Sequence, residues 1–358
     1  MVKQRFLALD IMRGLTLALM ILVNSPGSWN YVYAPLAHAE WHGATPTDFV
    51  FPFFLFMVGA ALVFSQKSLA AASHADRVKK ILKRTLLLFL IGVFLNAFPF
   101  IKPVEDWRIL GVLQRIALAY GLAALIVVYC NRAVRLVIAG AILLGYWALL
   151  QFSVDPYSLE HSVVRKLDLA LLGASHLWQG KGIPFDPEGL LSTFPSVVNV
   201  LMGVEAVTLL SSNTSRASAI QRLLLLGGVL IALGCLWGQV FPINKSLWTS
   251  PFVLLTSGVA IWVLSLLVVV ESTPVQKLLM PFTAFGMNPL FIYAASFMGE
   301  TLLWVIPVGD TSLYTTCFNV LATYFSPYSA SLLFAVINVV FYFSIAWVLQ
   351  RKKIVIAL

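Results

Sequence analysis

The stretch from Leu36 to Asp48 gathers the side chains that acid–base chemistry needs into one short loop. It holds two of the five histidines, His38 and His42, with carboxylates at Glu40 and Asp48 and no lysine or arginine. Histidine is the side chain whose ordinary pKa lies nearest neutral pH, so it can take a proton from an amine or a hydroxyl. A single loop histidine is most often an ordinary residue, but these neighbours favour a chemical site.

The rest of the loop suits a sugar ligand. Trp41 offers a flat apolar face of the kind that stacks on sugar rings, and Gly43 allows a tight turn. The run from Thr45 to Asp48 predicts the start of a helix, with Thr47 or Asp48 as the N-cap and the helix dipole directed back into the loop. Asp48 is then either that cap alone or a carboxylate that orients a histidine.

Polar residues in the apolar segment before the loop extend this site. Asn24 closes that segment, where its amide can donate to a developing oxyanion; considered alone, it would be a helix terminator. Asp10 and Arg13 share a helix face by their spacing and can pair. An ion pair that fixes the depth of the helix is favoured for them over a catalytic role.

Arg115 places a permanent cation inside another long apolar segment. It lies about seven residues into the predicted span, a depth on the order of 10 Å at 1.5 Å per residue. Its guanidinium suits a phosphate or a carboxylate of a ligand. A structural role, in which backbone carbonyls or a buried acid accept its hydrogen bonds, is an equally favoured alternative. Asn288 and the turn from Pro242 to Trp248 add polar groups at span ends, where interhelical hydrogen bonding is the common role.

The composition indicates which elements must position these residues. Of the 358 residues, 60% are hydrophobic and 11% charged, with a mean hydropathy of +0.90, whereas soluble domains are about a quarter charged. We therefore predict an all-α, polytopic bundle in a lipid bilayer. The net charge of +9 is explained by basic anchors in short loops, so no nucleic-acid partner is predicted. The three cysteines lie in apolar segments without CxxC spacing, which predicts neither a disulfide nor a metal site.

Apolar runs of roughly 17–25 residues predict about ten transmembrane helices. They lie near 6–24, 49–66, 81–98, 109–130, 134–152, 194–211, 219–238, 248–270, 281–299 and 332–350. Basic residues mark alternate connections: Lys3, Arg5 and Arg13; Lys67, Arg77, Lys79, Lys80, Lys83 and Arg84; Arg132 and Arg135; Arg216 and Arg222; Lys277; and Arg351, Lys352 and Lys353. The positive-inside rule then places both termini in the cytoplasm and the His38 loop outside.

Two long segments between the spans have their own predictions. Residues 300–331 are too weakly apolar for a full span, and we expect an interfacial or re-entrant helix. Residues 153–193 form a long outer loop whose mixed charges, Asp186 and Glu188 among them, suit a polar ligand. No internal repeat is visible, which gives no support to an inverted-repeat transporter.

Taken in order, the motifs resemble the heparan-α-glucosaminide N-acetyltransferase family and its bacterial relatives. The first part of the pattern is Leu9-Asp10, Arg13-Gly14, Val23-Asn24, His38-Ala-Glu-Trp-His-Gly43 and Thr47-Asp48-Phe-Val-Phe-Pro52. The remaining matches are Gly111-Val-Leu-Gln-Arg-Ile116, Asp186-Pro-Glu-Gly-Leu-Leu191, Pro242-Ile-Asn-Lys-Ser-Leu-Trp248 and Gly286-Met-Asn288.

The resemblance implies a single membrane domain over 1–358 that draws acetyl-CoA from the cytoplasm and acetylates an amino sugar on the periplasmic side of a bacterial inner membrane. It also makes a homodimer reasonable. His38 corresponds to the catalytic histidine of the motif, and Asn24 assists. His42 stands where the animal motif has Asn, which leaves open which histidine does the chemistry; we expect His38 to be the base.

We assign the candidate residues to three roles. The catalytic set is His38, Asn24 and Asp48, and no metal is expected. The cofactor-binding set, for acetyl-CoA, is Arg115, Gln114, Asn288, Asp10 and Arg13. The substrate-binding set is Trp41, His42, Glu40, Asp186, Glu188, Asn244, Lys245 and Trp248.

Other functions also fit the sequence. A sugar permease would bind an N-acetyl sugar with the same aromatic and carboxylate side chains, and a partner-binding membrane subunit would do no chemistry. The acceptor, the choice between amine and hydroxyl, and the choice between an acetyl-histidine and direct transfer stay open.

Overall fold

The computed structural model describes residues 6–70, 73–212 and 215–356, so Lys3 and Arg5, two of the predicted anchors, lie outside the described residues. Fourteen α-helices account for most of the described chain: α1 Leu7–Asn24, α2 Val50–Ala70, α3 His74–Ala97, α4 Val112–Tyr129, α5 Arg132–Leu150, α6 Val163–Leu172, α7 Leu190–Leu210, α8 Arg216–Trp237, α9 Ser250–Val270, α10 Gln276–Leu279, α11 Thr283–Met287, α12 Pro289–Val305, α13 Leu313–Tyr324 and α14 Pro327–Arg351. The strands β1 (Pro307–Val308) and β2 (Thr311–Ser312) form one short antiparallel hairpin. The predicted all-α fold is confirmed.

Eight of the described helices are long and apolar enough to cross a membrane, and a bent pair makes a ninth candidate. The protein is therefore a multi-pass membrane protein. The predicted span at 81–98 lies in α3, whose first half carries Asp76, Arg77, Lys79, Lys80, Lys83 and Arg84. This charge makes α3 less apolar than the eight. The sidedness of the termini stays a prediction.

The span predicted at 281–299 is bent and is not one straight helix. Gln276–Met287 and Pro289–Val305 meet at an angle of 77°. Asn288 leaves helical geometry at the bend, with φ −129° and ψ 51°, because it precedes a proline. Its side chain donates to the carbonyl of Ile354 (3.0 Å) and accepts from the amide of Ile356 (2.6 Å). Asn288 thus fixes the bend to the C-terminal segment.

The segment 300–331 contains the end of α12, the β-hairpin and α13. At about 1.5 Å per residue, the twelve residues of α13 extend about 18 Å, less than the hydrocarbon core. An interfacial or re-entrant position for α13 stays a prediction.

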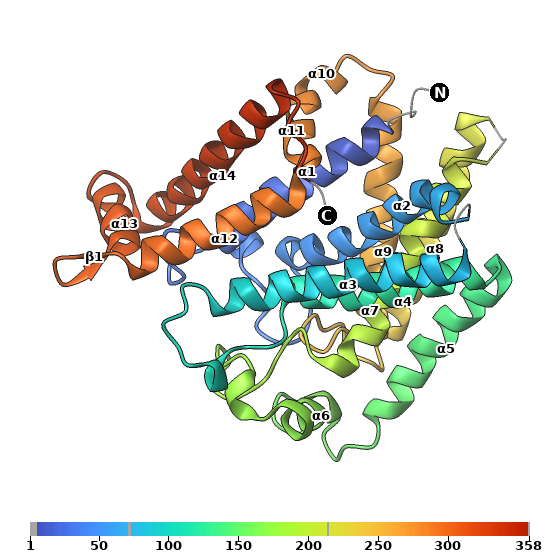
Figure 1. Ribbon diagram of the computed structural model, residues 1–358, viewed down its shortest axis with the longest axis horizontal. Coiled ribbons are helices and arrows are strands. Elements are labelled where there is room, and N and C mark those ends of the chain that lie inside the picture. The colour runs from blue at the N-terminus through green and yellow to red at the C-terminus, as the bar shows by residue number, and fades with distance from the viewer. Residues whose placement is uncertain (1–5, 71–72, 213–214, 357–358) are drawn as a thin grey trace. The chain divides into compact units, whose positions relative to one another are not determined.

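The chain divides into two compact units. The first unit comprises residues 1–39, 45–51 and 266–358. Within it, α1 packs against α11, α12 and α14, and α13 packs against α14 (Figure 1). The His38 loop is divided between the units: residues 36–39 and 45–48 belong to the first, and residues 40–44 belong to the second.

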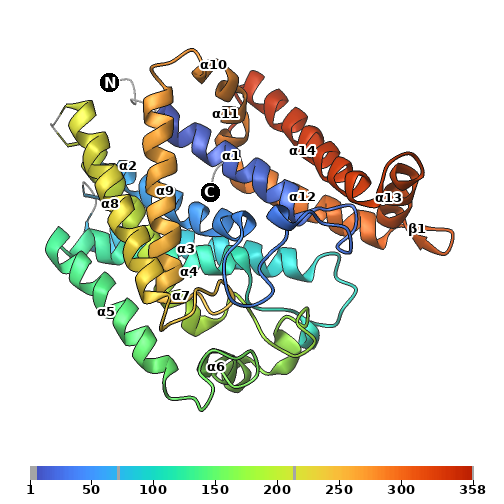
Figure 2. The same cartoon turned by 180° about the vertical axis from the view of Figure 1, so that it is seen from behind.

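The second unit comprises residues 40–44 and 52–265, and α7 lies at its centre. Helix α7 contacts α4, α5, α6 and α8, while α3 and α4 run side by side (Figure 2). Small residues allow α2 to approach α7: a Cβ at Gly203 would lie 1.9 Å from the Phe56 carbonyl oxygen, and one at Gly59 would lie 1.8 Å from that of Val200. The core of this unit therefore depends on glycines as well as on apolar side chains.

Candidate active site

His38 and Asp48 form a hydrogen-bonded pair in the first unit. His38 Nδ1 lies 2.7 Å from Asp48 Oδ1, and the Asp48 side chain is 1% exposed whereas that of His38 is 38% exposed. An ionised carboxylate only accepts, so Nδ1 carries the proton and Nε2 holds the lone pair of the neutral ring. This is the arrangement in which a histidine can accept a proton through Nε2.

The second carboxylate oxygen of Asp48 holds the loop backbone. Asp48 Oδ2 accepts from the amides of Ala39 (3.1 Å) and Thr45 (3.0 Å). Thr45 is the N-cap of the 3₁₀ helix η2 (Pro46–Phe49), so the expected cap at Thr47 or Asp48 is wrong. Asp48 instead completes the capping box from the third helical position while its other oxygen orients His38. Both functions considered for Asp48 are therefore present at once.

Asn24 is the last residue of α1, and its side chain is exposed. The next residue, Ser25, is buried and donates through its hydroxyl to Glu300 Oε2 at 3.1 Å. This contact ties the end of α1 to α12 and so positions Asn24. Glu300 was missed from the sequence, although a carboxylate inside an apolar segment is itself a signal.

Three of the residues predicted to bind acetyl-CoA come together in the first unit. Arg13 Nη1 lies 3.2 Å from Asp10 Oδ1, which confirms the predicted ion pair, and 3.3 Å from the carbonyl oxygen of Gly286. Asn288 follows two residues after Gly286. These residues belong to the beginning of α1 and to the bend between α11 and α12.

In the second unit, the predicted substrate residues Glu40, Trp41 and His42 line an open cleft of about 520 Å³. Asp155, Tyr157 and Lys181 also line it, and all three belong to the loop 153–193 that was expected to suit a polar ligand.

Hydrogen bonds hold the wall that carries Trp41. Trp41 Nε1 donates to the carbonyl of Tyr157 (2.7 Å), and Lys181 Nζ donates to the carbonyl of Glu40 (2.8 Å). Gly43, at φ +98°, donates its amide to the carbonyl of Ile243 (2.7 Å). The cleft is thus formed by segments far apart in the sequence.

Asn244 connects His42 to the turn from Pro242 to Trp248. Its side-chain amide nitrogen lies 3.3 Å from His42 Nδ1, and its Oδ1 accepts from the amide of Leu247 at 2.8 Å. Burial lowers the pKa of His42, and the charge of Asp155 opposes this shift. Asn244 is fully buried, and its binding of substrate stays a prediction.

The same turn holds Trp248 and Lys245. Trp248 is buried at φ +52°, a left-handed conformation that is uncommon outside glycine, and its Nε1 donates to Asn199 Oδ1 at 3.0 Å. Its amide donates to the carbonyl of Lys245, whose own side chain is half-buried. Trp248 thus has a structural function in the turn; its contact with substrate stays a prediction.

Arg115 lies one turn into α4, because that helix begins at Val112 and not near 109. Arg115 therefore follows the first residue of its helix by three positions and not by about seven. Its guanidinium lies over the Trp248 ring at 4.7 Å and donates to the Gly189 carbonyl (3.3 Å) and the Ser192 hydroxyl. Within the described part of the chain, its Nε and Nη1 have no hydrogen-bond partner.

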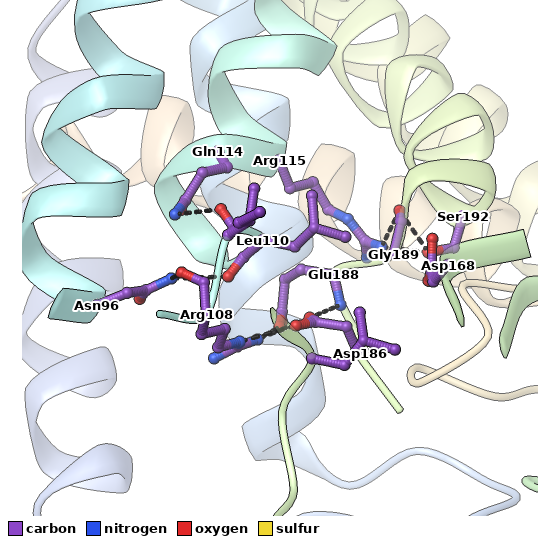
Figure 3. Close-up of polar contacts among 12 residues, drawn as sticks. Asn96, Arg108, Leu110, Gln114, Arg115, Asp168, Asp186, Glu188, Gly189 and Ser192 are labelled. Carbon is purple, nitrogen blue, oxygen red and sulfur yellow. Dashed lines mark hydrogen bonds and ion pairs between the residues drawn. The ribbon is translucent and has the colours of Figure 1, made fainter. Parts of the chain in front are cut away.

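A second arginine holds two of the predicted substrate residues in place (Figure 3). Arg108 donates from Nε and Nη2 to the two carboxylate oxygens of Asp186 (2.8 and 2.7 Å) and from Nη2 to Glu188 (2.6 Å). Burial would lower the pKa of Arg108, but the hydrogen bonds and charges of the two acids outweigh it and raise the pKa. Asp186 and Glu188 are thus used structurally, and their binding of substrate stays a prediction.

Neighbouring polar groups complete this network (Figure 3). Asn96 donates to the carbonyls of Arg108 (3.1 Å) and Leu110 (2.7 Å), and Gln114 donates to that of Ile109 (2.9 Å). Asp168 accepts from the amide of Leu190 through Oδ1, and burial raises its pKa to about 7. Gln114 therefore supports the segment before α4, and its contact with a cofactor stays a prediction.

Arg108→Ala is expected to destabilise the protein. It leaves Asp186 and Glu188 without their counter-charge, and breaking such a buried pair typically costs about 3–5 kcal/mol. Thermal unfolding in detergent measures the loss. Arg165→Ala is the matched control, because Arg165 donates to the carbonyls of Pro184 and Glu160. An equal loss in both variants would show that the charge network contributes nothing particular to stability.

The comparisons with known proteins identify the family of this chain. Residues 5–235 match the family model described as heparan-alpha-glucosaminide N-acetyltransferase, catalytic. The heparan-alpha-glucosaminide N-acetyltransferase of Homo sapiens is 26% identical over 98% of this chain and 59% of its own length. That of Mus musculus is 28% identical over 81% of this chain and 53% of its own length. The chain thus spans somewhat more than half the length of these curated relatives, and it belongs to the heparan-alpha-glucosaminide N-acetyltransferase catalytic family.

Proposed function

We propose that this chain is a membrane-embedded acetyltransferase that moves an acetyl group from cytoplasmic acetyl-CoA to an amino sugar on the opposite side of a bacterial inner membrane. The observation that carries this proposal is the hydrogen bond of 2.7 Å between His38 and Asp48. It supplies an oriented base in a family whose relatives are named as N-acetyltransferases. The homodimer expected from the resemblance stays a prediction.

The reaction requires a base and an oxyanion donor. The amine attacks the thioester carbonyl, a C–N bond forms, and the C–S bond breaks to release CoA. His38 takes the proton that the amine loses and can return it to the departing thiolate. The carbonyl oxygen becomes negatively charged in the tetrahedral intermediate, and the exposed amide of Asn24 is the proposed donor to it.

The cleft in the second unit supports an amino sugar as the acceptor. A volume of about 520 Å³ lies within the roughly 300–1,000 Å³ of small-molecule sites. Trp41 and Tyr157 provide aromatic surface for a sugar ring, and the carboxylates of Glu40 and Asp155 suit a cationic amine. Lys181 offsets one of these charges.

The acetyl-CoA residues remain a proposal with two parts. Asp10, Arg13 and Asn288 belong to one unit, and the hydrogen bond from Arg13 to Gly286 brings the beginning of α1 to the bend. This supports a donor site on the predicted cytoplasmic side. Gln114 and Arg115 belong to the other unit. Two nitrogens of Arg115 have no hydrogen-bond partner among the described residues, and they suit an anionic group.

The test is acetyl transfer by purified protein. Acetyl-CoA is added with glucosamine, and the released thiol and the N-acetylated sugar are measured together by thiol titration and mass spectrometry. Equal amounts of both products are expected. Uptake of sugar into proteoliposomes without acetylation would instead indicate a permease, and an O-acetylated product would change the acceptor group.

Asn24→Ala is expected to lower the rate of acetyl transfer by about 10²–10³-fold, the usual cost of losing one oxyanion donor. The donor forms its contact only as charge develops, so the affinity for acetyl-CoA should change little. Asn30→Ala, an exposed position in the loop after α1, is the matched control. A near-normal turnover number for Asn24→Ala would return Asn24 to the role of a helix terminator.

A further inference from the structure

The contacts of Asn244 determine which nitrogen of His42 carries the proton. Asn244 is fully buried, and its Oδ1 accepts the Leu247 amide at 2.8 Å. This bond fixes the orientation of the side-chain amide, so the NH₂ group faces His42 Nδ1 at 3.3 Å. An NH₂ group can only donate, so Nδ1 must accept. Neutral His42 therefore carries its proton on Nε2.

Two other histidines have the opposite arrangement. His38 Nδ1 faces the carboxylate of Asp48, and His176 Nδ1 faces the carbonyl oxygen of Trp107, each at 2.7 Å. Both partners only accept, so both rings carry the proton on Nδ1. In its neutral form His38 therefore has the N–H on Nδ1, whereas neutral His42 has it on Nε2.

Protonation of His42 is disfavoured by the same contact. A second proton would point from Nδ1 at the NH₂ group of Asn244, and two donors cannot bond each other. The charged groups that share the cleft are Glu40 and Asp155, which favour the imidazolium ion, and Lys181, which opposes it. Burial lowers the pKa of His42 and so acts in the same direction as this contact, and the charge of Asp155 opposes the shift.

We propose that His42 is a specificity-determining hydrogen-bond donor, whose Nε2–H binds an oxygen lone pair of the acceptor in the cleft, a sugar hydroxyl or ether oxygen. This assignment rests on the proposed acetyltransferase function. The chemistry follows from the tautomer: a ring with Nδ1 engaged by Asn244 and a proton on Nε2 has no nitrogen available to receive a proton from an amine. Trp41 and Tyr157 would hold the ring of the same sugar.

The tautomer can be measured without any substrate. In protein labelled with ¹⁵N-histidine, long-range ¹⁵N–¹H correlation spectra distinguish protonated from unprotonated ring nitrogens. His42 is expected to show an unprotonated Nδ1, and His176 serves as an internal reference with a protonated Nδ1. Signals are assigned by their loss in His42→Asn and His176→Asn. A protonated Nδ1 in His42 would overturn the proposal.

Asn244→Asp provides a matched variant that inverts the arrangement. Aspartate has the same shape, and one of its oxygens can still accept the Leu247 amide. Its other oxygen accepts a proton from His42, so the proton on the ring is expected to move to Nδ1. An unchanged His42 spectrum in a folded Asn244→Asp protein would show that Asn244 does not set the tautomer.

Kinetics then test the function of the Nε2–H group. His42→Leu removes the donor and is expected to raise the acceptor KM about three- to tenfold, the usual cost of one neutral hydrogen bond, with little change in kcat. His42→Asn, which keeps an N–H donor, should raise it less. His74→Leu, at the exposed start of α3, is the control. A loss of kcat with an unchanged KM in His42→Leu would overturn the proposal.

The two kinds of failure can be separated. If the unmodified protein transfers no acetyl group, the proposed function is wrong, and the spectrum still decides the tautomer of His42. If transfer occurs and His42→Leu leaves the acceptor KM unchanged, the acetyltransferase assignment stands and His42 does not select the acceptor.

Discussion

His38→Ala is expected to lower the rate of acetyl transfer by about 10²–10⁴-fold, the range that general-base catalysis usually contributes. The variant loses the Nε2 lone pair that Asp48 orients through Nδ1. Acetyl-CoA binding should persist, because the thioester does not need the base in order to bind. The measurement is the single-turnover rate at saturating acetyl-CoA, together with donor affinity by calorimetry.

Two controls separate the loss of a base from the loss of structure. Because the truncation removes a hydrogen bond from the buried Asp48, a loss of about 1–3 kcal/mol in stability is expected, and the rates are compared where thermal unfolding shows both proteins folded. Raising the pH supplies more unprotonated amine acceptor, so His38→Ala should recover part of its rate at alkaline pH. Turnover by His38→Ala close to that of the unmodified protein would show that another group accepts the proton.

The local features of the site could be read from the sequence. His38 and Asp48 were singled out because their types and spacing suit acid–base chemistry, and the structure pairs them. The N-cap was expected at Thr47 or Asp48 but lies at Thr45, and this error was avoidable. Proline is favoured at the first helical position, so Pro46 placed the cap at Thr45, and an acid three residues after a threonine is the pattern of a capping box.

The boundaries of the helices were less well predicted than their existence. Apolar composition gives the existence of a span but not its first residue, so α4 was expected to begin before Gly111, where the structure keeps the chain extended. The bend at Asn288 had a signal in Pro289, because the residue before a proline is disfavoured in helical geometry. A continuous apolar run concealed it.

The contacts that complete the site join residues far apart in the chain. Arg108 and Asp186 are 78 positions apart, and His42 and Asn244 are 202 apart. Neither pairing follows from periodicity or spacing. The sequence could therefore name Asp186, His42 and Asn244 as candidates. It could not show that Arg108 pairs with Asp186 or that Asn244 contacts His42.

Asp48→Asn is expected to lower acetyl transfer by about as much as removal of His38, because it inverts the His38 tautomer. Asp48 Oδ2 accepts two backbone amides, those of Ala39 and Thr45, so the single oxygen of asparagine must remain at that position. Its NH₂ group then replaces Oδ1 and donates to His38 Nδ1. The proton moves to Nε2, and the lone pair that would accept the proton from the amine is lost.

The expected loss is about 10²–10⁴-fold in rate, and the corresponding Asp-to-Asn change in a serine protease triad costs about 10⁴. Thermal unfolding should change little, since asparagine keeps the shape and both backbone hydrogen bonds. The ¹⁵N–¹H spectrum should show the proton of His38 on Nε2, the state that His42 already has. An inverted His38 with an unimpaired rate would exclude it as the base, because in that tautomer the only unprotonated nitrogen faces the side-chain amide of the introduced asparagine and cannot reach an amine.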